Sequence, residues 1–240
     1  MRILQVITRM NVGGTAVYLF NLQKGLESKG IFSPLLYGKV SSAEIEDIYV
    51  KNMNSIFSEY LSNSLNPLST FKSWIHFRQI IRKERFDVIH SHTFKAGLLS
   101  RTSKFKGCRI HTLHGESKGI SKTNIFTRML YIKLEKILAR KTDCYIFVGE
   151  QVFEDWINEG LRPKKYYVIP PGIEKSQIQN RKILQDGKVP VYGWLGRLVE
   201  IKDPFFLIEV AKEMKEAIFL MAGDGPLMAK IQQNAQFFLK

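Results

Sequence analysis

The chain of 240 residues is 45% hydrophobic and 24% charged, a composition that excludes a disordered or fibrous protein. Its net charge is +14, and residues 67–141 carry nearly all of the excess, with 17 Lys and Arg against 4 Asp and Glu. Charge of this kind suits anionic lipid headgroups, a phosphate-bearing acceptor or simply a solvated face, and without a recognised nucleic-acid motif we expect no nucleic-acid partner.

Strand and helix patterns alternate from the start of the chain, which predicts a parallel sheet with helices on both faces. Strands are expected over residues 3–7, 32–37, 87–90, 109–113, 144–148 and 166–169. Helices are expected from the first glycine pair to about residue 30, and over residues 67–85, 124–140 and 150–159. The segment 44–65 has no decisive pattern. These elements predict a Rossmann-like α/β domain over residues 1–170.

A polar stretch without periodicity follows Pro170-Pro171-Gly172, and we interpret residues 171–188 as a linker. A second α/β unit follows in residues 189–240, with strands over 191–195 and 218–222 and helices over 204–215 and from residue 226 onward. Two strands and two helices bury too little surface to offset chain entropy comfortably. We therefore expect a partial second Rossmann-like unit.

The two cysteines, Cys108 and Cys144, have no metal-type spacing, so we expect reduced core thiols and a cytoplasmic protein. No apolar run approaches the roughly 18 residues of a membrane span, and the start MRILQ lacks the features of a signal peptide.

The clearest candidate site residues follow predicted strands, because ligands of open α/β sheets bind beyond the carboxyl ends of the strands. Gly13 and Gly14 lie between the first strand and the first helix, where glycines let backbone N–H groups approach a bound anion; the alternative is a tight turn. Four histidines surround the ends of two consecutive strands: His90, His92, His111 and His114.

Of these four, His114, followed by Gly115, is placed to project into a crevice and to bond an anion or a hydroxyl. The alternatives are core histidines or metal ligands, but the spacing matches no zinc motif and we expect no metal.

In the second unit Arg197 and Lys202 follow the first strand and precede a helix that opens at Pro204. Arg grips phosphate oxygens in a bidentate manner, Lys adds a compact charge, and the helix N-terminus favours an anion, so this segment predicts pyrophosphate binding. Gly223 and Gly225 flank Asp224 in the next strand-to-helix turn, and taken alone they indicate only a turn.

Taken in order, seven segments resemble the retaining glycosyltransferases of family 4, which have the GT-B fold of two Rossmann-like domains. They are Ile3 to Val6 with Gly13-Gly14, DVIHSH (87–92), HTLHG (111–115), LEKILARKTD (134–143), VIPPGIE (168–174), GWLGRLVEIK (193–202) and AGDGPL (222–227).

The resemblance implies an acceptor-side N-terminal domain and a C-terminal domain that binds a nucleotide-diphosphate sugar as co-substrate, without a cofactor. Arg197 and Lys202 match the pair that neutralises the donor diphosphate, Gly14 matches the glycine that meets the phosphates, and His114 matches the histidine near the transferred sugar. His92, Gly115, Gly223 and Gly225 are further site candidates. The implied role is sugar transfer in surface polysaccharide, lipopolysaccharide or glycolipid biosynthesis, to a sugar or lipid-linked acceptor.

The sequence departs from the family pattern at Val148-Gly149-Glu150 and at Pro171-Gly172-Ile173-Glu174. The family's pair of glutamates that holds the ribose and the sugar is expected beyond Lys240, so we expect the 240 residues alone to be catalytically incomplete. Two alternatives stay open: a module that binds a membrane or a partner through residues 67–141, and a nucleotide-sugar epimerase of the same architecture. The localisation expected is cytoplasmic, at the inner face of the plasma membrane where the basic segment contacts lipid.

Overall fold

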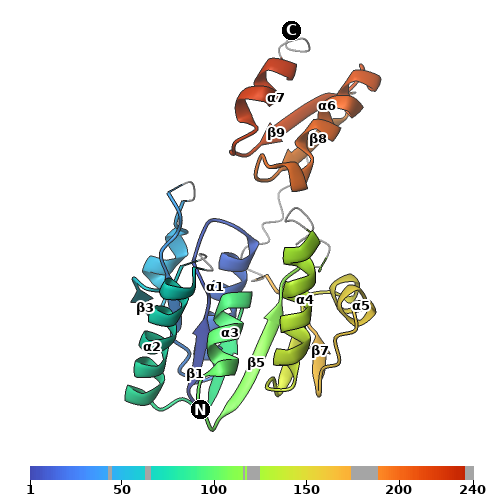
Figure 1. The fold of residues 1–240 in the computed structure, drawn as a ribbon. Coiled ribbons are helices and arrows are strands. Elements are labelled where there is room, and N and C mark those ends of the chain that lie inside the picture. Colours follow the sequence, from blue (N-terminus) through green and yellow to red (C-terminus); the bar gives the residue numbers. More distant parts are fainter. Residues whose placement is uncertain (43–44, 63–65, 116, 118–124, 174–188, 236–240) are drawn as a thin grey trace. The chain divides into compact units, whose positions relative to one another are not determined.

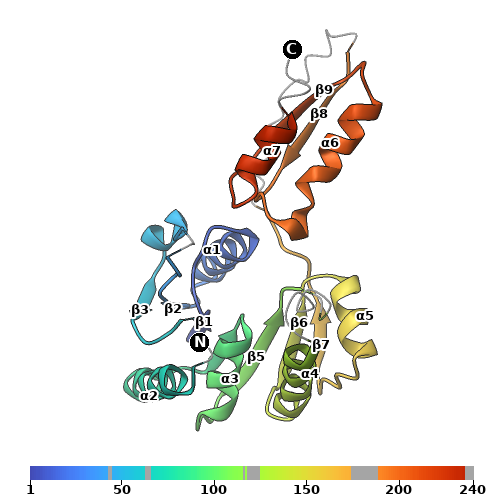
Figure 2. The same cartoon turned by 45° about the horizontal axis from the view of Figure 1, so that its top comes forward.

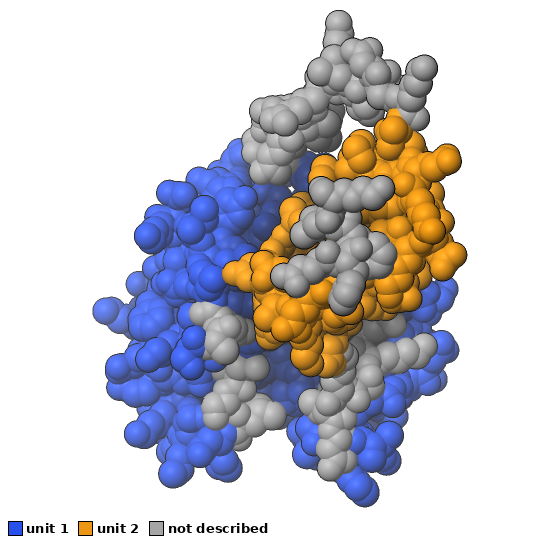
Figure 3. All heavy atoms as spheres, turned by 90° about the horizontal axis from the view of Figure 1, so that it is seen from above, with its two compact units in different colours: residues 1–178 blue, residues 179–240 orange. Residues whose placement is uncertain are grey.

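The computed structural model describes residues 1–42, 45–62, 66–115, 117, 125–173 and 189–235. The chain divides into two compact units, residues 1–178 and 179–240 (Figure 3). The division falls within the segment 171–188 that the sequence marks as a linker, most of which lies outside the described residues.

The first unit is built on a sheet whose seven strands all pair in parallel, in the order β3-β2-β1-β4-β5-β6-β7 (Figure 1). The strands are β1 (Ile3–Val6), β2 (Leu35–Gly38), β3 (Ser55–Ser58), β4 (Val88–Ser91), β5 (Cys108–Leu113), β6 (Cys144–Phe147) and β7 (Tyr166–Val168). The predicted parallel α/β fold is thus confirmed for this unit. Because all strands run the same way, their carboxyl ends share one rim.

Helices cover both faces of this sheet. The helix α1 (Gly14–Glu27) lies on one face with the short helix η1 (Ile48–Asn52), and α2 (Pro67–Lys83), α3 (Phe94–Thr102) and α4 (Ile125–Ala139) lie on the other (Figure 2). The helix α5 (Glu150–Asn158) connects β6 and β7. Each face has its own apolar core. The core under α2 and α3 includes Leu4, Val6, Phe77, Ile89 and Leu99, and the core under α1 includes Ile7, Met10, Leu19 and Leu35.

Local sequence explains where the best-defined helix begins and ends. At the start of α2, the side chain of Asn66 accepts a hydrogen bond from Leu68 N at 2.9 Å, and Pro67 occupies the first helical position. Both features are typical helix starts. Arg82 and Lys83 lie in the last turn, where cations interact favourably with the helix dipole.

Three elements differ from the sequence prediction. The strand expected over residues 32–37 begins at Leu35, immediately after Pro34. The edge strand β3 lies in the segment that had no decisive pattern. The helix α3 was not predicted. Seven of its nine residues are buried, and the polar residues Lys95, Ser100 and Arg101 are among them, so the helix has no clear division into an apolar buried face and a polar exposed face.

The second unit contains a parallel pair of strands, β8 (Val191–Leu195) and β9 (Ile218–Ala222), as the sequence predicts. The short helix η4 (Glu200–Lys202) precedes α6 (Pro204–Glu213), and α7 (Met228–Ala235) follows β9. One face of the pair packs on the helices around Leu198, Ile208 and Ile231. The opposite face leaves Leu195 and Leu220 exposed.

Candidate functional site

The rim at the carboxyl ends of β1, β4 and β5 gathers the candidate residues of the first unit. Gly13 and Gly14 follow β1, His92 follows β4, and His114 and Gly115 follow β5. The backbone N–H of His92 donates to the carbonyl of Val6 at 2.9 Å, which ties the ends of β4 and β1 together. The sequence expectation that the glycine pair and His114 share one rim therefore agrees with the sheet topology.

His92 is the centre of a hydrogen-bonded chain across this rim. Its Nε2 lies 2.6 Å from Oε1 of Gln5, and its Nδ1 lies 3.2 Å from Nε2 of His114. Gln5 and His92 are buried, whereas His114 is only partly so. The sequence analysis did not single out Gln5. The feature that could have identified Gln5 is its position as a polar residue inside the otherwise apolar strand β1.

A second group of side chains packs against this chain from the side. The ring of Tyr18 in α1 lies edge-on to His114, with centroids 4.9 Å apart, and the side chain of Thr112 interacts with the Tyr18 hydroxyl and lowers its pKa, against the larger effect of burial. Thr112 also lies 2.7 Å from Nε2 of His90, whose ring stacks 4.1 Å from that of His92. The sequence analysis missed Tyr18 and Thr112, which are ordinary residues in their local patterns.

Burial keeps all four histidines of the cluster neutral near pH 7. It lowers the pKa of His114 to about 4 and, with repulsion from His114, that of His90 to about 3. The pKa of His111 is also lowered to about 3 by burial, and that of His92 lies well below its ordinary value for the same reason. A neutral imidazole donates from one nitrogen and accepts at the other, so His114 offers the rim a directional hydrogen bond.

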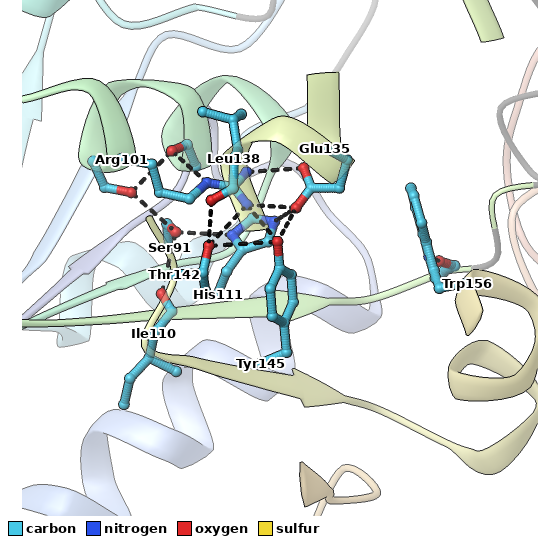
Figure 4. Close-up of polar contacts among 12 residues, drawn as sticks. Ser91, Arg101, Ile110, His111, Glu135, Leu138, Thr142, Tyr145 and Trp156 are labelled. Carbon is cyan, nitrogen blue, oxygen red and sulfur yellow. Dashed lines mark hydrogen bonds and ion pairs between the residues drawn. The ribbon is translucent and has the colours of Figure 1, made fainter. Parts of the chain in front are cut away.

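A buried ion pair supports β5 behind the rim (Figure 4). The guanidinium of Arg101 in α3 binds both carboxylate oxygens of Glu135 in α4, with Nη2 and Oε2 2.9 Å apart. Glu135 also accepts a hydrogen bond from the Tyr145 hydroxyl at 2.7 Å. His111 approaches the same carboxylate at 4.0 Å and bonds Ser91 at 2.8 Å. This network joins α3, α4, β4, β5 and β6.

The network also gives a structural meaning to the segment 134–143. Its glutamate is Glu135, and its final Asp143 accepts a hydrogen bond from the backbone N–H of Arg109 at 2.7 Å. Gly97 belongs to the same arrangement, because a Cβ there would lie 2.4 Å from Nη2 of Arg101. The segment therefore positions strands and helices behind the rim.

The two glycines of the first loop begin α1. Gly13 is the N-cap, with a φ of 158°, and no acidic residue lies in the first helical turn. A Cβ at Gly14 would meet no atom within 4 Å, so crowding among the described residues does not require this glycine. The first N–H groups of a helix have no intrahelical partner and favour an anion. A Cβ at Gly115 would likewise meet no described atom within 4 Å, and the Gly115 carbonyl accepts a hydrogen bond from the Trp156 indole at 3.0 Å.

In the second unit the residues predicted to bind the diphosphate lie between β8 and α6. Arg197 and Lys202 are both exposed, and Lys202 ends η4 just before the N-terminus of α6. Gly223 and Gly225 press against the loop that carries Arg197. A Cβ at Gly223 would lie 1.8 Å from the carbonyl oxygen of Gly196, and one at Gly225 would lie 2.5 Å from that of Leu198. These glycines are thus required by close backbone approach.

In the part of the chain that the structure describes, no group of three or more His, Cys, Asp or Glu side chains is arranged to hold a metal ion. Within the same residues, no helix has the length and apolarity to cross a bilayer.

In the basic segment 67–141, the helices α2 and α4 carry exposed apolar side chains together with exposed cations. Exposed apolar side chains on α4 include Ile125, Met129, Leu130 and Ile137, and those on α2 include Leu68 and Phe71. Exposed cations lie among them, including Lys72 and Arg82 on α2 and Lys133 on α4. Both helices flank α3 on one face of the sheet (Figure 1).

Comparisons with known proteins agree with the motif order. The family model described as Glycosyltransferase Family 4 matches residues 12–177. A curated relative, the UDP-Gal:alpha-D-GlcNAc-diphosphoundecaprenol alpha-1,3-galactosyltransferase of Escherichia coli, is 27% identical over 81% of this chain and 55% of its own. The capsular polysaccharide biosynthesis glycosyltransferase CapH of Staphylococcus aureus is 24% identical over 90% of this chain and 58% of its own. The chain thus spans a little over half the length of these relatives.

Among solved structures, Anabaena Alr3699/HepE in complex with UDP and glucose is similar, with a TM-score of 0.70 and 17% identity, over 99% of this chain and 66% of that one. This likeness shows the fold, and it confirms the GT-B architecture that the sequence predicts.

Proposed function

The chain belongs to glycosyltransferase family 4, and we propose that it provides the acceptor-side domain and part of the donor-binding domain of an enzyme that transfers a sugar from a nucleotide diphosphate. The proposal includes retention of the anomeric configuration. The observation that carries it is the pair Arg197 and Lys202, placed before the N-terminus of α6 in a loop fixed by two tightly packed glycines.

This loop suits the chemistry of the leaving group. When the glycosidic bond breaks, the diphosphate gains negative charge, and preorganised cations and helix N-terminal N–H groups stabilise that charge. Backbone hydrogen bonds hold the loop, from Gly196 N to Ala222 O at 3.0 Å and from Leu198 N to Asp224 O at 2.9 Å. Arg197 is therefore carried by a backbone that is ordered before the donor binds.

The rim of the first unit supplies a different chemistry. In the proposed reaction His114 bonds a hydroxyl of the transferred sugar, and the N–H groups at Gly13 and Gly14 meet the donor phosphates. The partly buried imidazole of His114, neutral because burial lowers its pKa to about 4, suits a sugar hydroxyl better than a strongly anionic group.

The test compares three single-alanine variants by isothermal titration with UDP-galactose, UDP-glucose and GDP-mannose. Arg197→Ala and Lys202→Ala should each weaken binding at least tenfold. Lys212→Ala, which changes an exposed lysine in the last turn of α6, should leave binding unchanged. In the enzyme that contains this chain, each of the first two changes should cost roughly a hundredfold in transfer rate, or about 3 kcal/mol. Equal effects of all three variants would reject the proposed diphosphate site. The anomeric configuration of the product, read by NMR, tests retention.

For the acceptor we propose a saccharide or lipid-linked intermediate of surface polysaccharide synthesis, handled at the inner face of the plasma membrane. The names of the relatives support this, since one acts on a diphosphoundecaprenol acceptor and another belongs to capsular polysaccharide biosynthesis. The exposed apolar and basic side chains of α2 and α4 would place the protein at an anionic lipid surface. Vesicle binding without any nucleotide-sugar binding would instead favour a membrane-binding module.

A further inference from the structure

Three side chains that are distant in sequence form one continuous hydrogen-bonded chain at the rim. Gln5 comes from β1, His92 follows β4, and His114 follows β5. The contacts are 2.6 Å from Gln5 Oε1 to His92 Nε2, and 3.2 Å from His92 Nδ1 to His114 Nε2. Each contact needs one donor and one acceptor, so the proton positions along the chain depend on one another.

Gln5 sets the direction of this chain. Its amide nitrogen donates to the hydroxyl of Ser33 at 3.2 Å, and its carbonyl oxygen lies 2.6 Å from Nε2 of His92. An amide oxygen only accepts, so Nε2 of His92 must carry the hydrogen. In a neutral imidazole the other nitrogen, Nδ1, is then an acceptor. His114 must therefore donate from its own Nε2.

We propose that Gln5 and His92 are positioning residues that hold His114 in its Nε2–H tautomer, with Nδ1 left as a hydrogen-bond acceptor. The edge of the Tyr18 ring also lies against the His114 ring, with centroids 4.9 Å apart. Neither Gln5 nor His92 needs to touch a ligand to act in this way.

The tautomer determines what His114 can bind. An unprotonated Nδ1 accepts a hydrogen bond from a hydroxyl group, and it repels the lone pairs of a phosphate oxygen. For the enzyme, this consequence rests on the proposed function. Nδ1 of His114 would accept a hydrogen bond from a sugar hydroxyl, and other groups would have to bind the diphosphate.

The test reads the tautomer directly. In the 240-residue chain with ¹⁵N-labelled histidines, two-bond ¹⁵N–¹H correlation spectra at pH 7 distinguish a protonated ring nitrogen from an unprotonated one. The expected pattern has Nε2 protonated and Nδ1 unprotonated in both His92 and His114. If His114 carries its hydrogen on Nδ1, the proposal is overturned, whether or not any variant folds.

Two matched variants test the role of Gln5. Gln5→Met removes the acceptor of His92 and should change the His114 signals from one tautomer to an average of two. Gln23→Met makes the same change at a second buried glutamine, which donates to the carbonyl of Ser33 at 2.6 Å and, among the described residues, forms no hydrogen bond with a histidine. It should leave the His114 tautomer unchanged. Equal responses of the two variants, or no response to Gln5→Met, would refute the positioning role. If His114 has the expected tautomer but the protein binds no nucleotide sugar, the proposed function is contradicted and the positioning role is not.

Discussion

Removing one partner of the buried pair Arg101–Glu135 should strongly destabilise the first unit. Each side chain is 1% exposed, and the contact is bidentate. Glu135→Gln keeps the size of the side chain but leaves the Arg101 charge buried without a counter-ion. Breaking such a pair costs about 3–5 kcal/mol, a large part of the roughly 5–15 kcal/mol that stabilises a typical domain.

The assay is urea unfolding followed by tryptophan fluorescence in a Trp194→Phe background, because the other two tryptophans, Trp74 and Trp156, lie in the first unit. With a urea dependence of about 2 kcal/mol per molar, the expected loss lowers the midpoint by roughly 1.5–2.5 M. The matched control is Glu84→Gln, whose partner is Arg2 and whose side chain is 43% exposed. That change should cost less than about 1 kcal/mol.

The double variant Arg101→Met/Glu135→Leu separates charge from packing. Because it removes both charges together, it should recover a large part of the stability lost in Glu135→Gln. Two results would refute the assignment of a desolvated ion pair. One is a Glu135→Gln midpoint within 0.3 M of the parent, which corresponds to about 0.6 kcal/mol. The other is a double variant that is even less stable than Glu135→Gln, as expected if the two changes were independent and their costs added.

Three further outcomes follow from the structure. Burial lowers the pKa of His90 to about 3 and that of His114 to about 4, so the unfolded chain takes up protons that the folded chain does not as the pH falls below about 6.5. The free energy of unfolding should therefore fall from about pH 6.5 to pH 4, and a flat urea midpoint over this range would contradict neutral buried histidines. Gly223→Ala should destabilise the second unit by about 1–3 kcal/mol, because its Cβ would overlap the Gly196 carbonyl. Gly193→Ala should not, because a Cβ there meets no described atom within 4 Å, and differential scanning calorimetry compares the two variants. Sedimentation with vesicles should show binding to anionic lipid that weakens from 0.1 M to 1 M salt as the Debye length falls from about 10 Å to about 3 Å, and equal binding to neutral vesicles would reduce the basic segment 67–141 to a solvated face.

The sequence was sufficient for every described strand except β3, and for the placement of Gly14 and His114 after their strands. Alternating apolar strands and amphipathic helices are local patterns, and a parallel sheet brings all its carboxyl ends to one rim whatever its side chains are. The order of the seven motif segments added the family, which the family model confirms.

Where periodicity is absent, the sequence could not indicate an element. The helix α3 buries polar and apolar residues alike, so no amphipathic pattern indicates it, and β3 is a four-residue edge strand in a segment without a decisive pattern. Both elements are stabilised by what packs against them, which a local pattern does not contain.

Only the tertiary structure decided which polar residues work together. Gln5, His92 and His114 meet because β4 lies between β1 and β5 in the sheet. The order of strands across a sheet is not determined by the sequence of any single segment. The same holds for Arg101 and Glu135, 34 residues apart, whose buried pair shows that part of a family motif supports the rim from behind. Hydrogen-bond partners across strands depend on register and packing over the whole domain, so their chemistry emerges when the sheet has formed.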